Sequence, residues 1–239
     1  MNETLPQPPP DAPMPPPTEA ALRSQRRRNW IVGVGTLSVI FVGVLSLPFW
    51  IHTDKSADLT EAISNCRQMG LALMEFEADY GSFPDDSTRQ LVQERIPGNT
   101  IAMGTASSND YFRQLIAAGI STSEMMFYAK TSGTHKPDNV TSGIAALAKG
   151  ECAFAYVIGH STKSDPKTPV VLFPLAKGKL LFETSNKHLH GKVVVMFADN
   201  SFTSYPLDKS GHVFINGKDL FDPSQPFWGG KAPVVKWPE

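Results

Sequence analysis

The chain has 239 residues, of which 41% are hydrophobic and 19% charged, and its formal net charge is −1 at pH 7. This balance leaves no broad basic surface, so we expect no nucleic-acid partner. The two cysteines are too few for the disulfide framework of small secreted proteins. Along the chain, a proline-rich tail (1–29) precedes an apolar run (30–51) and a mixed remainder (52–239).

The tail and the apolar run predict a membrane anchor. Eight prolines between Pro6 and Pro17 favour an extended, disordered tail that cannot bury a core. Residues 30–51 carry no charge and are long enough to cross a hydrocarbon layer, which needs about 20 helical residues. Arginines crowd only the first flank, so we expect a single-pass protein of the bacterial inner membrane, with a cytoplasmic N-terminus and a periplasmic remainder.

A cleaved signal peptide is the alternative interpretation of the same run. The run exceeds the usual core of ~7–15 residues, and no A-x-A cleavage site follows it, so we favour the retained anchor. Pro48 lies near the outer end of the run, where it is expected to kink the helix. Gly33, Gly35 and Gly43 allow neighbouring helices to approach closely in lipid.

A second, amphipathic helix follows the apolar run from Asp58 onward. Its apolar positions recur every three or four residues, which indicates one buried helix face. Gly81 is placed to adopt a left-handed cap and Pro84 prevents continuation. The positions on the predicted buried face are Leu59, Ile63, Cys66, Gly70, Leu73, Phe76 and Tyr80.

Two shorter helices and a helical turn are predicted next. Asp86, Ser87 and Thr88 are expected to begin a helix that ends at Arg95, with Gln90 as the capping-box partner of Ser87. Residues 107–110 (SSND) predict the start of a helix that ends at Gly119, and residues 142–148 predict a further helical turn.

After residue 150 the hydrophobic period changes to two, which is typical of strands. A turn signal at residues 198–201 predicts a hairpin. Because helices come first and strands afterwards, we expect an α+β fold in which an antiparallel sheet packs on the long helix. The predicted strands are 152–158, 169–175, 179–183, 192–198, 201–205, 212–215 and 233–236.

Two stretches carry a family resemblance. Residues 65–73 (NCRQMGLAL), followed by 80–85 (YGSFPD), resemble the helix and Phe-Pro turn of G-like type II secretion pseudopilins. Residues 190–200 (HGKVVVMFADN) are similar to the His-x9-Asp-Gly tail of other bacterial prepilin-like proteins, with one residue fewer and Asn200 in place of glycine. Asparagine also tolerates the left-handed turn conformation.

The resemblance implies a pilin-like fold and a structural role in protein transport, as part of a type II secretion or pilus-like system. The partners that it implies are other pilin-like or secretion subunits, or further copies of the chain itself. The chain departs from the prepilin pattern because residues 30–51 contain no acidic residue. We therefore expect a permanently anchored protein instead of a processed filament subunit. The resemblance also implies a structural calcium near Asp208, Asp219 and Asp222, although these lack the dense spacing of a calcium loop.

The sequence contains no G-x-x-x-x-G-K-[ST], H-E-x-x-H, C-x-x-C or G-x-S-x-G motif, so we expect no enzymatic activity and no cofactor. Ser164 and Lys167 satisfy S-x-x-K, but Pro166 lies within that turn and favours a chance match. Cys66 and Cys152 are open to two interpretations, a single disulfide or two small buried side chains.

Three functional hypotheses follow. The first is an anchored assembly protein that acts through helix packing and displays a periplasmic head. The second is an anchored module that binds a polysaccharide or peptide with the aromatic C-terminal loops near Phe221, Phe227 and Trp228. The third is an anchored metal-dependent hydrolase that uses His188, His190 and Asp199, residues that otherwise belong to an exposed turn.

Overall fold

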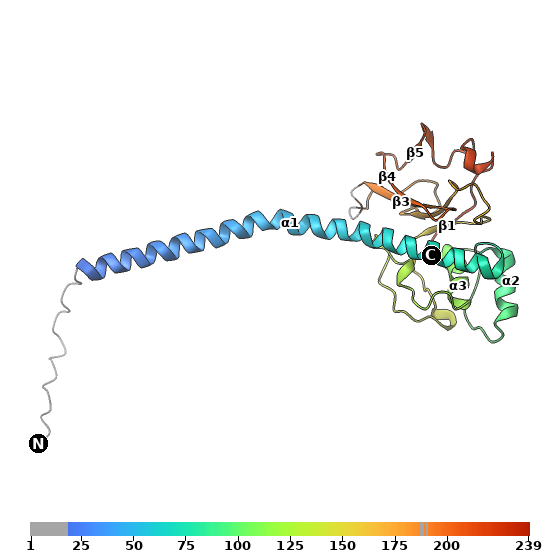
Figure 1. Cartoon of the computed structure of the whole chain (residues 1–239), viewed down its shortest axis with the longest axis horizontal. Coiled ribbons are helices and arrows are strands. Elements are labelled where there is room, and N and C mark those ends of the chain that lie inside the picture. Colours follow the sequence, from blue (N-terminus) through green and yellow to red (C-terminus); the bar gives the residue numbers. More distant parts are fainter. Residues whose placement is uncertain (1–18, 187–188, 190) are drawn as a thin grey trace, which may run out of the picture. The chain divides into compact units, whose positions relative to one another are not determined.

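The computed structural model describes the backbone of residues 19–186, 189 and 191–239, without the side chains of 37–56 and of scattered positions from 20 to 35. The chain divides into two compact units, Met1–His52 and Thr53–Glu239. Helix α1 has the bounds Glu19–Tyr80 (Figure 1). No helix of the described residues is long and apolar enough to cross a membrane. Most of the side chains of the predicted span, 30–51, lie outside that description.

The second unit is an α+β domain, as the order of helical and strand patterns predicts. Its remaining helices are α2 (Asp86–Arg95), α3 (Ser108–Ala117) and the 3-10 turns η1 (Met125–Phe127), η2 (Gly143–Ala145) and η4 (Pro226–Trp228). Its strands are β1 (Ala155–Val157), β2 (Pro169–Phe173), β3 (Lys192–Phe197), β4 (Phe202–Pro206), β5 (Phe214–Ile215), β6 (Lys218–Asp219) and β7 (Val235–Lys236).

Side-chain caps fix the beginnings of α2 and α3. Ser107 and Asp110 form the capping box that begins α3, and this start was predicted. The predicted cap of α2 is wrong, because Asp85 is the capping residue and Thr88, not Gln90, completes the box. Asp85 accepts hydrogen bonds from the backbone N–H groups of Ser87 and Thr88 at 2.8 and 2.9 Å.

Five strands form one antiparallel sheet in the order β4-β3-β2-β1-β7, and β5 and β6 form a small separate hairpin. The predicted hairpin at residues 198–201 joins β3 to β4, with Asn200 in the left-handed conformation at φ 61°. The predicted strand at 179–183 is wrong, because only a single bridge joins Leu175 to Phe182 there. The helical turn expected at 142–148 is limited to η2.

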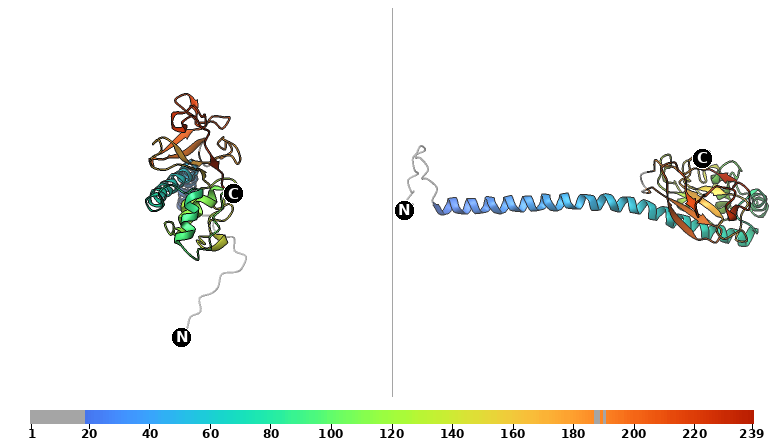
Figure 2. Two further views of the ribbon diagram at one scale, coloured as in Figure 1. Left: turned by 90° about the vertical axis from the view of Figure 1, so that its right-hand side faces the viewer. Right: turned by 90° about the horizontal axis from the view of Figure 1, so that it is seen from above.

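Both faces of the sheet are covered, and residues on alternate positions of one strand enter different cores. Val171 and Phe173 of β2 pack with α1 and α3, whereas Leu172 packs under the C-terminal segment. Figure 2 shows α1 and α3 on one side of the sheet and the orange-red segment that carries β5, β6 and η4 on the other. This double coverage explains why β2 is a continuous apolar run, PVVLF, with every residue buried.

Candidate functional site

The described part of α1 is fitted closely to the β3–β4 hairpin. A Cβ added at Gly70 would lie 1.8 Å from Oδ1 of Asn200 and 2.9 Å from Sδ of Met196, so glycine is needed for this approach. Three residues earlier, the Arg67 guanidinium lies 4.6 Å from the centre of the Phe202 ring. The two sequence stretches that carry the family resemblance are therefore in direct contact.

Polar contacts fix the helix at two further points. The side-chain amide of Asn65 donates to the backbone carbonyl of Tyr128 at 2.8 Å. The Glu77 carboxylate accepts from the backbone N–H and the hydroxyl of Thr162 at 2.9 and 3.0 Å. Because Asn65 and Glu77 lie on either side of Gly70 in the sequence, these contacts fix the orientation of α1 about its own axis.

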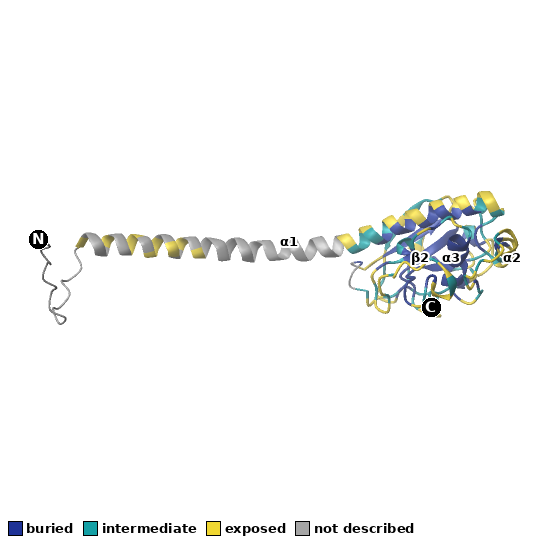
Figure 3. Cartoon of the chain, turned by 90° about the horizontal axis from the view of Figure 1, so that it is seen from below, coloured by how far each residue is buried: buried dark blue, intermediate teal, exposed yellow. Residues whose placement is uncertain are grey.

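In this orientation, one stripe of residues on α1 faces outward. Figure 3 shows the helix dark blue toward the domain and yellow on its outer side. Leu71 is 59% exposed and Met74 is 37% exposed, a large fraction for apolar side chains on an ordered helix. The outward stripe consists of Ser64, Arg67, Leu71, Met74 and Ala78, which repeat at intervals of three and four residues.

The helix ends as its sequence predicts. Gly81 is in the left-handed conformation at φ 89°, and its N–H donates to the Glu77 carbonyl at 2.7 Å. The Pro84 carbonyl accepts from the hydroxyl of Tyr156 at 3.0 Å, which fastens the turn to β1. The other positions predicted to be structurally important, Gly33, Gly35, Gly43 and Pro48, lie outside the described side chains.

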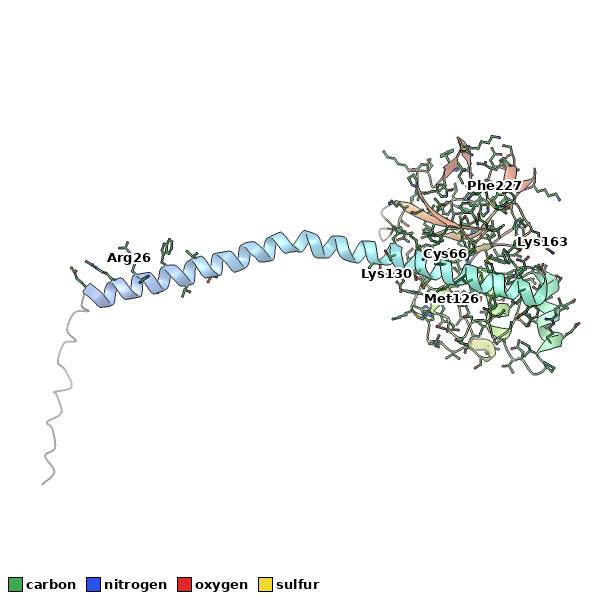
Figure 4. The ribbon with its side chains drawn as sticks, in the orientation of Figure 1. Arg26, Cys66, Met126, Lys130, Lys163 and Phe227 are labelled. Carbon is green, nitrogen blue, oxygen red and sulfur yellow. The ribbon has the colours of Figure 1, made fainter. Side chains whose placement is uncertain are left out.

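The structure has Cys66 and Cys152 as free thiols, so the disulfide alternative does not hold there. Cys66 lies on the buried face of α1 (Figure 4), and both side chains belong to the core between helices and sheet. Burial raises the pKa of each thiol to about 12. These are the small buried side chains of the other interpretation, and they are poor nucleophiles.

Only Asp199 of the three predicted hydrolase residues belongs to the described chain. His188 and His190 lie outside the described residues. Asp199 has its carboxylate 3.8 Å from Nζ of Lys167. That ammonium group also lies 5.5 Å from the centre of the Phe197 ring. Lys167, the lysine of the S-x-x-K match, thus contacts β3 and the hairpin.

The three C-terminal aspartates take part in hydrogen bonds of local turns. Asp208 accepts from the backbone N–H groups of Ser210 and His212. Asp219 contacts Nδ1 of His212 at 2.6 Å, and Asp222 accepts from the N–H of Ser224 at 2.8 Å. Among the described residues these aspartates form no group with metal-ligand spacing, and the calcium expected near them stays a prediction.

A different acidic group, which sequence analysis missed, lies between α3 and β1. Glu124, Asp138 and Glu151 each offer one oxygen, and these oxygens lie within 4.8 Å of one another. Burial raises the pKa of Glu124, and the nearby carboxylates of Glu151 and Asp138 raise it further. No spacing signal marks the group in the sequence, because its members are brought together by irregular loops.

A cavity of about 350 Å³ opens on the outer side of the sheet. Phe227 lies at this side of the molecule, in the C-terminal segment (Figure 4). Trp228, in contrast, is buried and donates its indole N–H to the Leu220 carbonyl at 2.7 Å, so it covers the sheet. The cavity is lined by Asp165, Lys167, Phe197, Thr203, Tyr205, Ile215, Asn216, Gln225, Pro226 and Phe227.

Comparison of the chain with family models, with curated proteins and with solved structures finds no match.

Proposed function

We propose that the chain is a membrane-anchored, pseudopilin-like assembly protein. Residues 30–51 anchor it in the bacterial inner membrane, the N-terminus is cytoplasmic, and the α+β domain is displayed in the periplasm. The observation that carries the proposal is the outward stripe of α1, an ordered helix face with exposed apolar side chains. Its task is lateral packing with α1 of a second copy or of a related subunit.

The spacing of the outward stripe supports helix packing. Intervals of three and four residues average about 3.5, the repeat that keeps one helix seam facing another. Leu71 and Met74 supply apolar contact area at its centre, and Ser64 and Ala78 are small enough for close approach. An isolated exposed leucine would need no explanation, but a regular seam on a rigid helix does.

The fit of α1 to the hairpin supports the same proposal. Contacts at Asn65, Gly70 and Glu77 fix which side of the helix faces outward. A subunit that assembles through one helix face needs that face held in a constant orientation. In the anchor, Gly33, Gly35 and Gly43 would extend the packing into the lipid.

Cysteine crosslinking tests the proposal without changing the native thiols, because burial raises the pKa of both to about 12. In membranes from cells expressing Leu71→Cys, mild oxidation should give a disulfide-linked dimer, since α1 packs against α1. Lys209→Cys, an exposed position on the C-terminal segment, is the matched control and should stay monomeric. A monomeric Leu71→Cys protein, or equal crosslinking at both positions, would contradict self-assembly through this face.

Ligand binding in the cavity is the second candidate function. The cavity combines the aromatic rings of Phe197, Tyr205 and Phe227 with polar groups, which is the composition expected of a polysaccharide or peptide site. Phe227→Ala removes one wall of the cavity, whereas Phe214→Ala removes an aromatic ring that is 54% exposed and outside it. Saturable binding on a glycan array that is lost only in Phe227→Ala would favour this function.

A further inference from the structure

The segment between α3 and β1 carries a charge arrangement that the assembly function does not use. Glu124 and Glu151 are buried at 0% and 2% exposure, and Asp138 lies at the surface beside them. Their carboxylate oxygens lie within 4.8 Å of one another, a separation at which like charges repel. The described residues 118–154 form no helix or strand beyond the two short turns η1 and η2.

Glu124 supplies the observation that points to a ligand. Its Oε1 accepts a short hydrogen bond from the backbone N–H of Leu147. Its Oε2 is buried and has no hydrogen-bond partner among the described residues. Buried carboxylate oxygens are rarely left without a partner, because losing their water is costly. An ion between the three carboxylates would provide that partner.

We propose that Glu124, Asp138 and Glu151 bind a calcium ion that fastens the loops between α3 and β1. Calcium takes six to eight oxygens at about 2.3–2.6 Å, so one ion can bridge opposing oxygens about 4.8 Å apart. The ligand atoms are all carboxylate oxygens, which suit calcium better than zinc. Asp138 is at the surface, which gives the ion an entrance and leaves its other positions to water.

The remaining hydrogen bonds of the group orient it for this role. Glu151 accepts from the N–H of Ala148 at 2.6 Å and from the N–H of Asp138 at 3.1 Å. His135 also contacts the group: its Nε2 lies 3.9 Å from a Glu151 carboxylate oxygen, and its side chain is 62% exposed. Arg113 is engaged elsewhere, by Asp110 and Glu239 at 2.8 and 2.7 Å.

Calorimetry on the full chain, purified in mild detergent and treated with EDTA, tests the proposal. Titration with CaCl2 should give one site per chain. At a hundredfold excess over Kd, the thermal midpoint should rise by about 5–10 °C, because the ion binds the folded state only. MgCl2 should give a smaller shift, since magnesium prefers shorter bonds and keeps its waters.

Two aspartates provide a matched pair of variants. Asp138 and Asp165 are both exposed, and each accepts a hydrogen bond from the N–H two residues later, at 2.9 and 2.8 Å. Asp138→Asn should lower calcium affinity at least tenfold, whereas Asp165→Asn should leave it unchanged. Glu124→Gln keeps the shape and removes the repulsion, so it should match or exceed the wild-type midpoint in EDTA and lose the calcium response.

Several results would overturn the proposal. Wild type without binding heat and without a thermal shift would show that the group holds no calcium. A shift with ZnCl2 alone would assign a different metal. A full calcium response in the Asp138→Asn and Glu124→Gln double variant would place the ion elsewhere. None of these results depends on α1 assembly, so the crosslinking experiment stands or fails separately.

Discussion

The contact between Gly70 and Asn200 predicts that Gly70→Ala destabilises the native protein but stabilises an Asn200→Gly variant. In Gly70→Ala, the new methyl group would meet Asn200 Oδ1 at 1.8 Å, and overpacking of this kind costs about 1–3 kcal/mol. Alanine gains about 1 kcal/mol over glycine in a helix interior. The single variant should therefore lose about 0–2 kcal/mol of unfolding free energy.

Removing the obstructing side chain should reverse this effect. Asn200 is at φ 61°, where glycine is unstrained, and its Oδ1 is buried with no hydrogen-bond partner among the described residues. In an Asn200→Gly background, Gly70→Ala keeps its helix gain, and its methyl group meets only Sδ of the flexible Met196 side chain, at 2.9 Å. Gly70→Ala should then add about 1 kcal/mol to the unfolding free energy. The coupling energy between the two positions in the double-mutant cycle is therefore about 1–3 kcal/mol.

The assay is urea unfolding of the full-length protein in mild detergent, followed by tryptophan fluorescence, to which the buried Trp228 contributes. Asn216→Gly is the matched control, because Asn216 is also left-handed, at φ 52°, and lies between β5 and β6. Gly70→Ala should show no coupling to it. A coupling to Asn200 below about 0.5 kcal/mol, or equal rescue by Asn216→Gly, would refute the described fit of α1 to the hairpin.

The remaining predictions concern the core, the caps and pH. In the native protein Cys66 and Cys152 should not react with a thiol reagent at pH 8, and both should react in denaturant; reaction without unfolding would contradict their burial. Arg113→Ala should cost about 3–5 kcal/mol in urea unfolding, because it leaves Asp110 with a buried, unpaired charge, and a loss below about 1 kcal/mol would argue against the buried pair. Burial alone would raise the pKa of Asp110, but the N–H groups of Ser107, Ala106 and Gly104 and the Arg113 charge lower it below its usual value. Because the folded pKa is lowered, the ionised Asp110 stabilises the fold above about pH 4, and this contribution is lost as the pH falls through the folded pKa. The difference in unfolding free energy between wild type and Asp110→Asn should therefore shrink below about pH 4. A gap of constant size from pH 3 to 6 would exclude this linkage.

Sequence patterns predicted the elements whose cause is local. Ser107 with Asp110 marks the start of α3, and Gly81 marks the end of α1, since caps depend on residues within one turn. The period-two apolar run around Tyr156 predicted a strand, because side chains alternate along any strand, and Tyr156 lies in the core that α1 shares. The α+β arrangement followed from the order of these patterns.

Features that depend on distant contacts were missed or misplaced. Residues 179–183 have the composition of a strand, but only Phe182 finds a bridge, because the chain bends back toward Gly211. The acidic group draws on residues at 124, 138 and 151, which only the folded loops bring together. Trp228 looked available for binding, yet its indole hydrogen bond to Leu220 turns it toward the core.

The most direct test of the assembly proposal is the mass of the protein in gentle membrane extracts, measured by analytical ultracentrifugation. Leu71→Arg places a charge at the centre of the outward stripe, and Lys209→Glu changes an exposed charge away from it. The proposal predicts an oligomer for wild type and Lys209→Glu and a monomer for Leu71→Arg. Equal masses for all three proteins would contradict assembly through the outward stripe of α1.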